Sequence, residues 1–150
     1  MERSINRELK LKAYGICLYK KNQYGTYILL CLSSKSLQKW GFVKGVQEGA
    51  ETNQETAIRE FYEESSILID EKYLGNYFHQ INISKDIGVY LVDYDAVSCL
   101  DKYFINHELK SIYLSQENTD IKFFDIKRLP KIKKKQSILV RQIVNSLEDL

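Results

Sequence analysis

Three glutamates lie close together in the chain at a spacing that suits metal-dependent chemistry. Glu60, Glu63 and Glu64 follow one another at positions i, i+3 and i+4. On an α-helix these positions share one edge, where like charges repel by roughly a few tenths of a kcal/mol per pair. A hard cation such as Mg²⁺ or Mn²⁺ takes oxygen ligands and would relieve that repulsion. The spacing alone leaves a solvated acidic helix face as the alternative.

The surrounding residues predict the helix that carries these glutamates. Thr52 or Asn53 can cap its start, and Glu55 is placed to complete a capping box with Thr52. An apolar stripe at helical spacing follows. The residues of this stripe, which we expect to face the core, are Ala57, Ile58, Phe61 and Tyr62.

Strand-forming segments lie on both sides of this helix. The expected strands cover residues 11–19, 27–32, 73–83, 87–92 and 121–126, with a hairpin turn at 20–25, an ordered loop at 35–45 and a second amphipathic helix at 134–147. This order predicts an α/β or α+β sandwich rather than a helical bundle. The length of 150 residues is that of one domain, 1–150.

The composition argues against several classes of protein. Hydrophobic residues make up 44% of the chain and charged residues 28%, as in ordinary soluble domains. No run approaches the ~20 apolar residues of a membrane span, and the first residues carry no apolar signal segment. The widely spaced Cys17, Cys31 and Cys99 are expected to be reduced, buried thiols, which favours a cytoplasmic location. We find no DNA-binding motif, and the pattern is compatible with a monomer or a homodimer.

The wider context of the glutamates resembles a known motif. Gly45, Glu51 and the segment 59–67 have the spacing of the Nudix box, G-x5-E-x7-R-E-U-x-E-E-x-G-U, where U is a bulky apolar residue. Every position matches except Ser66, where the family carries glycine. That residue follows the helix and usually adopts φ > 0, so serine should cost about 1 kcal/mol there. It is not a ligand position.

This resemblance implies a fold, a reaction and a set of site residues. The expected fold is the Nudix α/β/α sandwich, with a mixed β-sheet and the loop-helix-loop of the box. The expected activity is that of a Mg²⁺- or Mn²⁺-dependent pyrophosphohydrolase. The implied metal ligands are Glu60, Glu63, Glu64 and the backbone carbonyl of Lys44, with Glu63 and Glu64 also catalytic. Glu51 is expected to reach the metal through water and Arg59 to orient carboxylates through ion pairs, and both are grouped with the candidate substrate-binding residues.

Two flanking segments bear on the substrate. Residues 40–45, W-G-F-V-K-G, resemble the W-G-F-P-K-G of mRNA decapping enzymes, bacterial RNA 5′ pyrophosphohydrolases and asymmetric diadenosine tetraphosphate hydrolases. Lys44 is therefore a candidate phosphate contact, and Trp40 and Phe42 are candidate substrate contacts. Residues 123–130 resemble the W-F-x-I-x-x-L-P segment of decapping-type members, in which a glutamate six residues earlier acts as base or metal ligand. That position is Glu117 in this chain. Glu108 and Asp120 are the alternative candidates for the base.

The carboxyl-terminal third is basic and contains adjacent aromatic residues. Such a surface can follow a nucleic-acid backbone, although a solvated basic face has the same composition. We therefore predict RNA 5′ ends, capped or triphosphorylated, as the substrate. The alternatives are a dinucleoside polyphosphate or free nucleotide, and a non-catalytic module that only binds nucleotide or RNA. The basic residues are Lys122, Lys127, Arg128, Lys131, Lys133, Lys134, Lys135 and Arg141.

Overall fold

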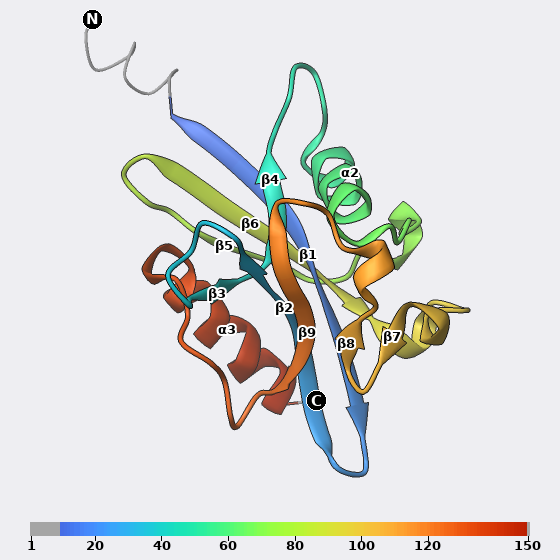
Figure 1. Cartoon of the computed structure of the whole chain (residues 1–150). Helices are drawn as coiled ribbons and strands as arrows, with labels where there is room; N and C mark the ends of the chain where they lie inside the picture. The colour runs from blue at the N-terminus through green and yellow to red at the C-terminus, as the bar shows by residue number, and fades with distance from the viewer. Residues whose placement is uncertain (1–9, 150) are drawn as a thin grey trace, which may run out of the picture.

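A computed structural model describes residues 10–149, so the expected absence of a signal segment falls partly on residues outside the description. The strands are β1 (Leu11–Asn22), β2 (Gly25–Ser33), β3 (Trp40–Gly41), β4 (Val43–Val46), β5 (Tyr77–Gln80), β6 (Lys85–Asp93), β7 (Phe104–Ile105), β8 (Glu108–Leu109) and β9 (Asn118–Asp125) (Figure 1). The α-helices are α2 (Asn53–Ser65) and α3 (Ser137–Glu148). Short 3₁₀ turns are η1 (Glu71–Tyr73), η2 (Tyr94–Ala96), η3 (Asp101–Tyr103), η4 (Ser111–Tyr113) and η5 (Lys134–Gln136).

The strands form one mixed sheet in the order β5-β6-β1-β2-β9-β8-β7, with β3 paired to β2 and β4 paired to β1. β1 and β6 run parallel, and the other pairs are antiparallel. The long strand β1 changes partner along its length. Residues 13–16 pair with β4, whereas residues 19–22 pair with β2. The chain can therefore place β4, and the loop that follows it, beside helix α2.

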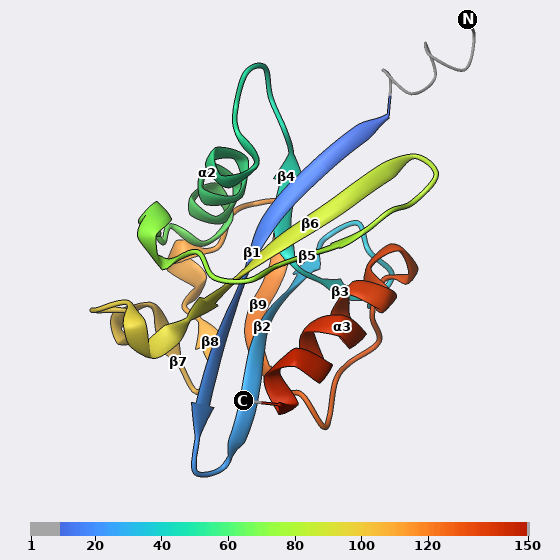
Figure 2. The ribbon, with the colours of Figure 1, turned by 180° about the vertical axis from the view of Figure 1, so that it is seen from behind.

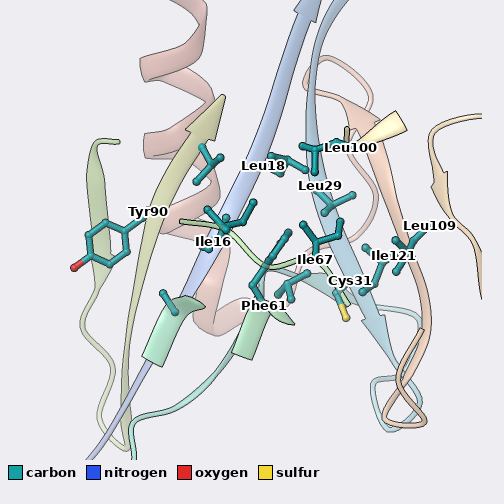
Figure 3. Close-up of a cluster of buried hydrophobic side chains, with 14 of the residues drawn as sticks. Ile16, Leu18, Leu29, Cys31, Phe61, Ile67, Tyr90, Leu100, Leu109 and Ile121 are labelled. Carbon is teal, nitrogen blue, oxygen red and sulfur yellow. The ribbon is translucent and has the colours of Figure 1, made fainter. Parts of the chain in front are cut away.

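Helices α2 and α3 cover opposite faces of this sheet (Figures 1 and 2). Side chains alternate between the two faces along a strand, so Ile16 and Leu18 join the core under α2 while Cys17 joins the core under α3. Phe61 is the large α2 side chain at the centre of the first core (Figure 3). This arrangement confirms the predicted α/β/α sandwich with a mixed sheet.

The ends of α2 follow the sequence prediction. The Thr52 hydroxyl accepts a hydrogen bond from Glu55 N at 3.1 Å, and the Glu55 carboxylate accepts one from Thr52 N at 2.8 Å, which completes the capping box. Ser66 adopts φ 66°, the left-handed conformation that glycine takes more easily. Its hydroxyl donates to the Tyr113 carbonyl at 3.1 Å, so a tertiary contact offsets part of the backbone cost.

Three expectations about the elements are wrong. The strand predicted over 73–83 is reduced to β5, because the chain first forms the 3₁₀ turn η1, in which the Asp70 side chain accepts from Lys72 N. Tyr62 is 52% exposed, because Phe61 and Glu64 occupy the inward face of the helix instead. Cys99 is exposed, in a connection between strands rather than in the core.

Candidate active site

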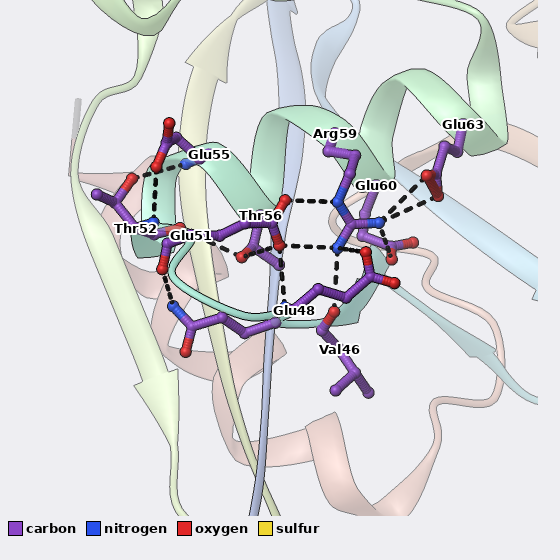
Figure 4. A network of polar contacts seen from close by, with 10 residues as sticks. Val46, Glu48, Glu51, Thr52, Glu55, Thr56, Arg59, Glu60 and Glu63 are labelled. Carbon is purple, nitrogen blue, oxygen red and sulfur yellow. Dashed lines mark hydrogen bonds and ion pairs between the residues drawn. The ribbon is translucent and has the colours of Figure 1, made fainter.

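Arg59 is the centre of the polar network on α2 (Figure 4). Its Nε donates to Glu51 Oε2 at 2.6 Å, and its Nη2 donates to Glu51 Oε1 at 3.0 Å and to the Val46 carbonyl at 3.1 Å. Its Nη1 donates to Glu60 Oε1 at 2.9 Å and to both carboxylate oxygens of Glu63 at 3.2 Å. One guanidinium thus connects the loop before the helix to Glu60 and Glu63, two of the three clustered glutamates on α2.

Glu51 is committed to holding that loop. Besides Arg59, it accepts hydrogen bonds from Glu48 N and from the Thr56 hydroxyl, both at 3.0 Å. The hydrogen bonds from Arg59 are the main reason that the pKa of Glu51 falls to about 2. Its carboxylate is therefore charged at all ordinary pH values and already fully bonded. The contacts indicate a positioning role for Glu51 and Arg59, in which they shape the site without facing a substrate.

Glycine at position 45 is required by the approach of Glu60. A Cβ placed on Gly45 would lie 2.0 Å from the carboxyl carbon of Glu60, so any other residue would displace that carboxylate from its present position. Burial raises the pKa of Glu60, while Arg59 opposes the shift. The first glycine of the box therefore allows β4 to pack directly beneath one carboxylate.

Glu64 points inward rather than along the same edge. Its Oε1 accepts a hydrogen bond from Asn118 Nδ2 at 2.9 Å, and the Cys31 thiol donates to Asn118 Oδ1 at 2.8 Å. Within residues 10–149, Glu64 Oε2 is the one buried side-chain oxygen or nitrogen without a hydrogen-bond partner. Burial, reinforced by the charges of Glu60 and Glu117, raises the pKa of Glu64 to about 7. The sequence did not predict this role of Asn118. Its one sequence signal is that it is a polar residue directly after Glu117, where the related segments carry isoleucine.

The three glutamates expected as metal ligands have different partners in this arrangement of side chains. Among residues 10–149, no three Asp, Glu, His or Cys side chains are placed to enclose an ion. Glu63 is half exposed and paired with Arg59, and Glu64 is turned into the protein. The reason is that an arginine neutralises Glu60 and Glu63 locally, which the spacing alone does not reveal.

The residues nonetheless fit a divalent cation. The unpartnered Glu64 Oε2 is a hard oxygen donor, and Glu60 lies close enough to raise the pKa of Glu64. Glu60 or Glu63 would have to exchange its bond from Arg59 Nη1 for the ion. The guanidinium would remain held, because Nε and Nη2 bond separately to Glu51 and Val46. Lys44, whose carbonyl is the further expected ligand, lies in β4 opposite Gly15.

The three candidate bases fall in two places. Glu117 is exposed in the turn before β9, and its charge raises the pKa of both Glu60 and Glu64. Ser34 anchors this turn, because its backbone N and hydroxyl both donate to the Glu117 carbonyl, at 3.0 and 3.1 Å. Glu108 and Asp120 instead line a separate cavity of about 330 Å³ near β7 and β8. The position of Glu117 makes it the better candidate.

The Glu108–Asp120 pair has a measurable consequence for stability. Burial, with the hydrogen bond and charge of Glu108, raises the pKa of Asp120 to about 6. A carboxyl whose folded pKa is raised stabilises the fold when protonated and loses this contribution as pH rises through 6. At pH 8, Asp120→Asn should therefore be more stable than the wild type by less than about 1 kcal/mol and should unfold at a higher temperature. Near pH 4 the difference should vanish. Thermal melts at the two pH values test this; an equal difference at both would contradict it.

Trp40 and Phe42, the expected substrate contacts, are core residues. They are 8% and 4% exposed and pack in the cluster under α3. The buried Gln136 holds this segment by accepting a hydrogen bond from Phe42 N at 2.7 Å, and it lies against Gly41, where a Cβ would come within 2.6 Å of its amide. Trp40 N also donates to the Lys131 carbonyl at 2.8 Å. These aromatic residues thus fasten the basic segment to the sheet.

That fastening creates a lysine-lined cavity of about 210 Å³, with no acidic residue in its lining. Burial, and then the charges of Lys85 and Lys133, lower the pKa of Lys44 to about 8. The charge of Glu64 has the opposite effect on the pKa of Lys44, so the charges of the lysines and of this carboxylate both act on Lys44. The cavity gathers lysines from three regions of the chain: Lys39, Lys44, Lys85, Lys133, Lys134 and Lys135.

Comparisons with known proteins identify the family and agree with the fold. The family model described as the NUDIX domain matches residues 9–142. Among solved structures, a C. elegans Ap4A hydrolase in a binary complex has a TM-score of 0.65 at 21% identity and covers 93% of this chain and 99% of that one. The M. smegmatis Nudix hydrolase RenU gives 0.68 at 12% identity, with 93% and 86% covered. The NUDIX domain of Shewanella oneidensis NrtR, complexed with ADP ribose, gives 0.63 at 14%, with 92% and 88% covered.

Two further comparisons are negative. A search of curated proteins by sequence finds no match. In the part of the chain from residue 10 to 149, no helix combines the length and the apolar composition needed to cross a membrane.

Proposed function

Because the chain belongs to the Nudix family of metal-dependent phosphoanhydride hydrolases, we propose that its substrate is the polyphosphorylated 5′ end of an RNA, capped or triphosphorylated. The whole chain would act as one catalytic domain. The observation that carries the proposal is the lysine-lined cavity, in which Lys44 also interacts electrostatically with Glu64.

The chain's own residues have distinct roles in this reaction. Glu64, with Glu60 and Glu63, would hold Mg²⁺ or Mn²⁺, which neutralises phosphate charge and lowers the pKa of water when bound. Glu117 is exposed and close enough to the clustered glutamates for its charge to raise the pKa of Glu64, so it is suited to accept the proton of the attacking water. Lys44 supplies a positive charge for the phosphates, and Arg59 keeps Glu51 and the preceding loop in place.

The lysine cavity favours a substrate with charge beyond the cleaved anhydride. A diphosphate would be satisfied by the metal and Lys44, whereas the cavity also contains Lys133, Lys134 and Lys135, from the segment just before α3. Burial, and then the charges of Lys85 and Lys133, lowers the pKa of Lys44, and a bound polyanion would relieve the repulsion between these lysines. An RNA has both the 5′ phosphates and a continuing phosphodiester backbone to fill such a surface.

A turnover panel tests the proposal against its competitors. Purified protein with Mg²⁺ is given triphosphorylated RNA, capped RNA and diadenosine tetraphosphate. We expect an RNA to be cleaved with the highest kcat/KM. Faster cleavage of diadenosine tetraphosphate would replace the proposal with the dinucleoside reading. Binding of any of the three without cleavage would instead identify a non-catalytic module.

The role of the cavity is tested by salt dependence. Lys133→Ala and Lys134→Ala should each weaken RNA binding and reduce the slope of log K against log salt by about 1, as for the loss of one phosphate contact. Lys127→Ala is the matched control, because this exposed lysine lies on the same connection but outside the cavity. If Lys133→Ala and Lys134→Ala had the same slope as the wild type and the control, these two lysines would not contact the RNA.

A further inference from the structure

A continuous row of paired residues crosses the sheet from the carboxylates to its outer edge. Gly45, which lies under Glu60, is opposite Tyr14 in β1. Tyr14 is opposite Gly88 in β6, and Gly88 is opposite His79 in β5. Directly paired residues project to the same face, so this row lies on the α2 side of the sheet. Gly88 stands two strand spacings, roughly 10 Å, from the residue under Glu60.

An aromatic surface lies at the outer end of this row. The ring of Tyr77 covers Gly88, where a Cβ would lie only 2.1 Å from the Tyr77 hydroxyl oxygen. Tyr77 stacks with His79 at a centroid distance of 5.8 Å and an interplanar angle of 29°, and it packs on Tyr90 at 4.8 Å. Neighbours therefore fix the ring in place, yet Tyr77 remains 40% exposed.

The same surface carries polar groups next to the rings. A cavity of about 260 Å³ is lined by Tyr14, Tyr77, His79 and Gly88 together with Lys12 and Asp86. Asp86 Oδ1 accepts from Lys10 Nζ at 2.8 Å, which holds the carboxylate at the rim. A flat ring beside a fixed carboxylate and a lysine matches a nucleobase, which has two π faces and an edge of donors and acceptors.

We propose that this surface binds the nucleobase of the substrate, stacked on the exposed ring of Tyr77. The separation of Gly45 and Gly88 is one that the ribose and phosphate between the base and the cleaved anhydride would bridge, passing over the buried Tyr14. This inference rests on the proposed function for the identity of the phosphate site. It adds a second recognition element on the α2 side of the sheet, apart from the lysine cavity.

Binding without turnover tests the inference. In the presence of a metal chelator, guanosine 5′-monophosphate and adenosine 5′-monophosphate are compared with ribose 5-phosphate, which lacks a base, by NMR titration of the ¹⁵N-labelled protein. Both base-bearing probes should bind roughly tenfold tighter than ribose 5-phosphate, as expected for one base stacked on an aromatic ring. The amide signals of Tyr77 and Gly88 should shift only with the base-bearing probes. Equal affinity for all three probes, or no binding of the nucleotides, would overturn the proposal.

Three variants separate stacking from general damage. Tyr77→Ala should abolish the preference for a base, while Tyr77→Trp should retain it. Gly88→Ala should also abolish it, because the added methyl group displaces the ring without deleting it. Tyr24→Ala is the control, since Tyr24 is 77% exposed at the β1–β2 turn, outside the cavity. A preference that survives in Tyr77→Ala would refute the site.

Turnover distinguishes this inference from the proposed function. If RNA is cleaved, Tyr77→Ala should raise KM with little change in kcat, because stacking acts equally on the ground and transition states. Failure to cleave RNA would contradict the proposed substrate. The base site would still be tested by whether the nucleotides bind more tightly than ribose 5-phosphate. Cleavage of RNA without any base preference would overturn the base site alone.

Discussion

Replacing Glu64 by glutamine is expected to lower kcat by about 10²–10³-fold without unfolding the protein. The substitution keeps the size of the side chain and the hydrogen bond that Asn118 donates to Oε1. It removes the negative charge and the unpartnered Oε2, the strongest candidate ligand for a cation. Steady-state kinetics with Mg²⁺ and with Mn²⁺ measure the loss.

Two measurements show whether this loss arises from the cation. Mg²⁺ or Mn²⁺ should raise the melting temperature of the wild type but not of Glu64→Gln, since binding to the folded state stabilises it. Without metal at pH 8, Glu64→Gln should be at least as stable as the wild type. Burial raises the pKa of Glu64 to about 7, so at pH 8 the wild type carries a buried charge that destabilises the fold and that glutamine lacks. Glu55→Gln, in the capping box of the same helix, is the control with unchanged kcat. Retention of full activity by Glu64→Gln would exclude this carboxylate from the reaction.

The second large effect is expected from Arg59→Met, which keeps the aliphatic volume and removes the guanidinium. Glu51 and the Val46 carbonyl would lose their donors, and Glu60 and Glu63 would repel each other without compensation. We expect the free energy of unfolding to fall by about 2 kcal/mol, less than for a fully buried pair because Arg59 and Glu51 remain partly exposed. Urea denaturation at pH 7 measures this change.

The same variant should change the response to acid. The lowered pKa of Glu51 contributes stability above pH 4.5, which the wild type loses as pH falls towards 2. In Arg59→Met this part of the acid dependence should disappear. Arg128→Met, at an exposed arginine on the β9–α3 connection, provides the control. If Arg59→Met matched the wild type in both stability and activity, the network in Figure 4 would have no role in shaping the site.

Local patterns predicted the elements that carry the site. The capping box of Thr52 and Glu55 marked the start of α2, and apolar spacing placed Phe61 in the core. The same spacing predicted wrongly that Tyr62 is buried. A helix next to a sheet buries only a narrow stripe, and Glu64, three residues after Phe61, occupies it in place of Tyr62. The strand over 73–83 was overestimated because the chain first forms the 3₁₀ turn η1, and β5 then pairs with β6 only from Tyr77 to Gln80.

The resemblance of Gly45, Glu51 and residues 59–67 to the Nudix box implied the reaction class, and the family match over residues 9–142 confirms the membership on which it rests. The partners of each carboxylate depended on segments distant in the chain. Asn118 reaches Glu64, Glu117 adds its charge, and Lys44, Lys85 and Lys133 meet in one cavity only after β1, β2 and β9 have paired. Burial of Trp40 likewise depended on α3 packing against the sheet. Hydrogen bonds, desolvation and charge act over a few ångströms in space, so the order of residues along the chain does not specify them.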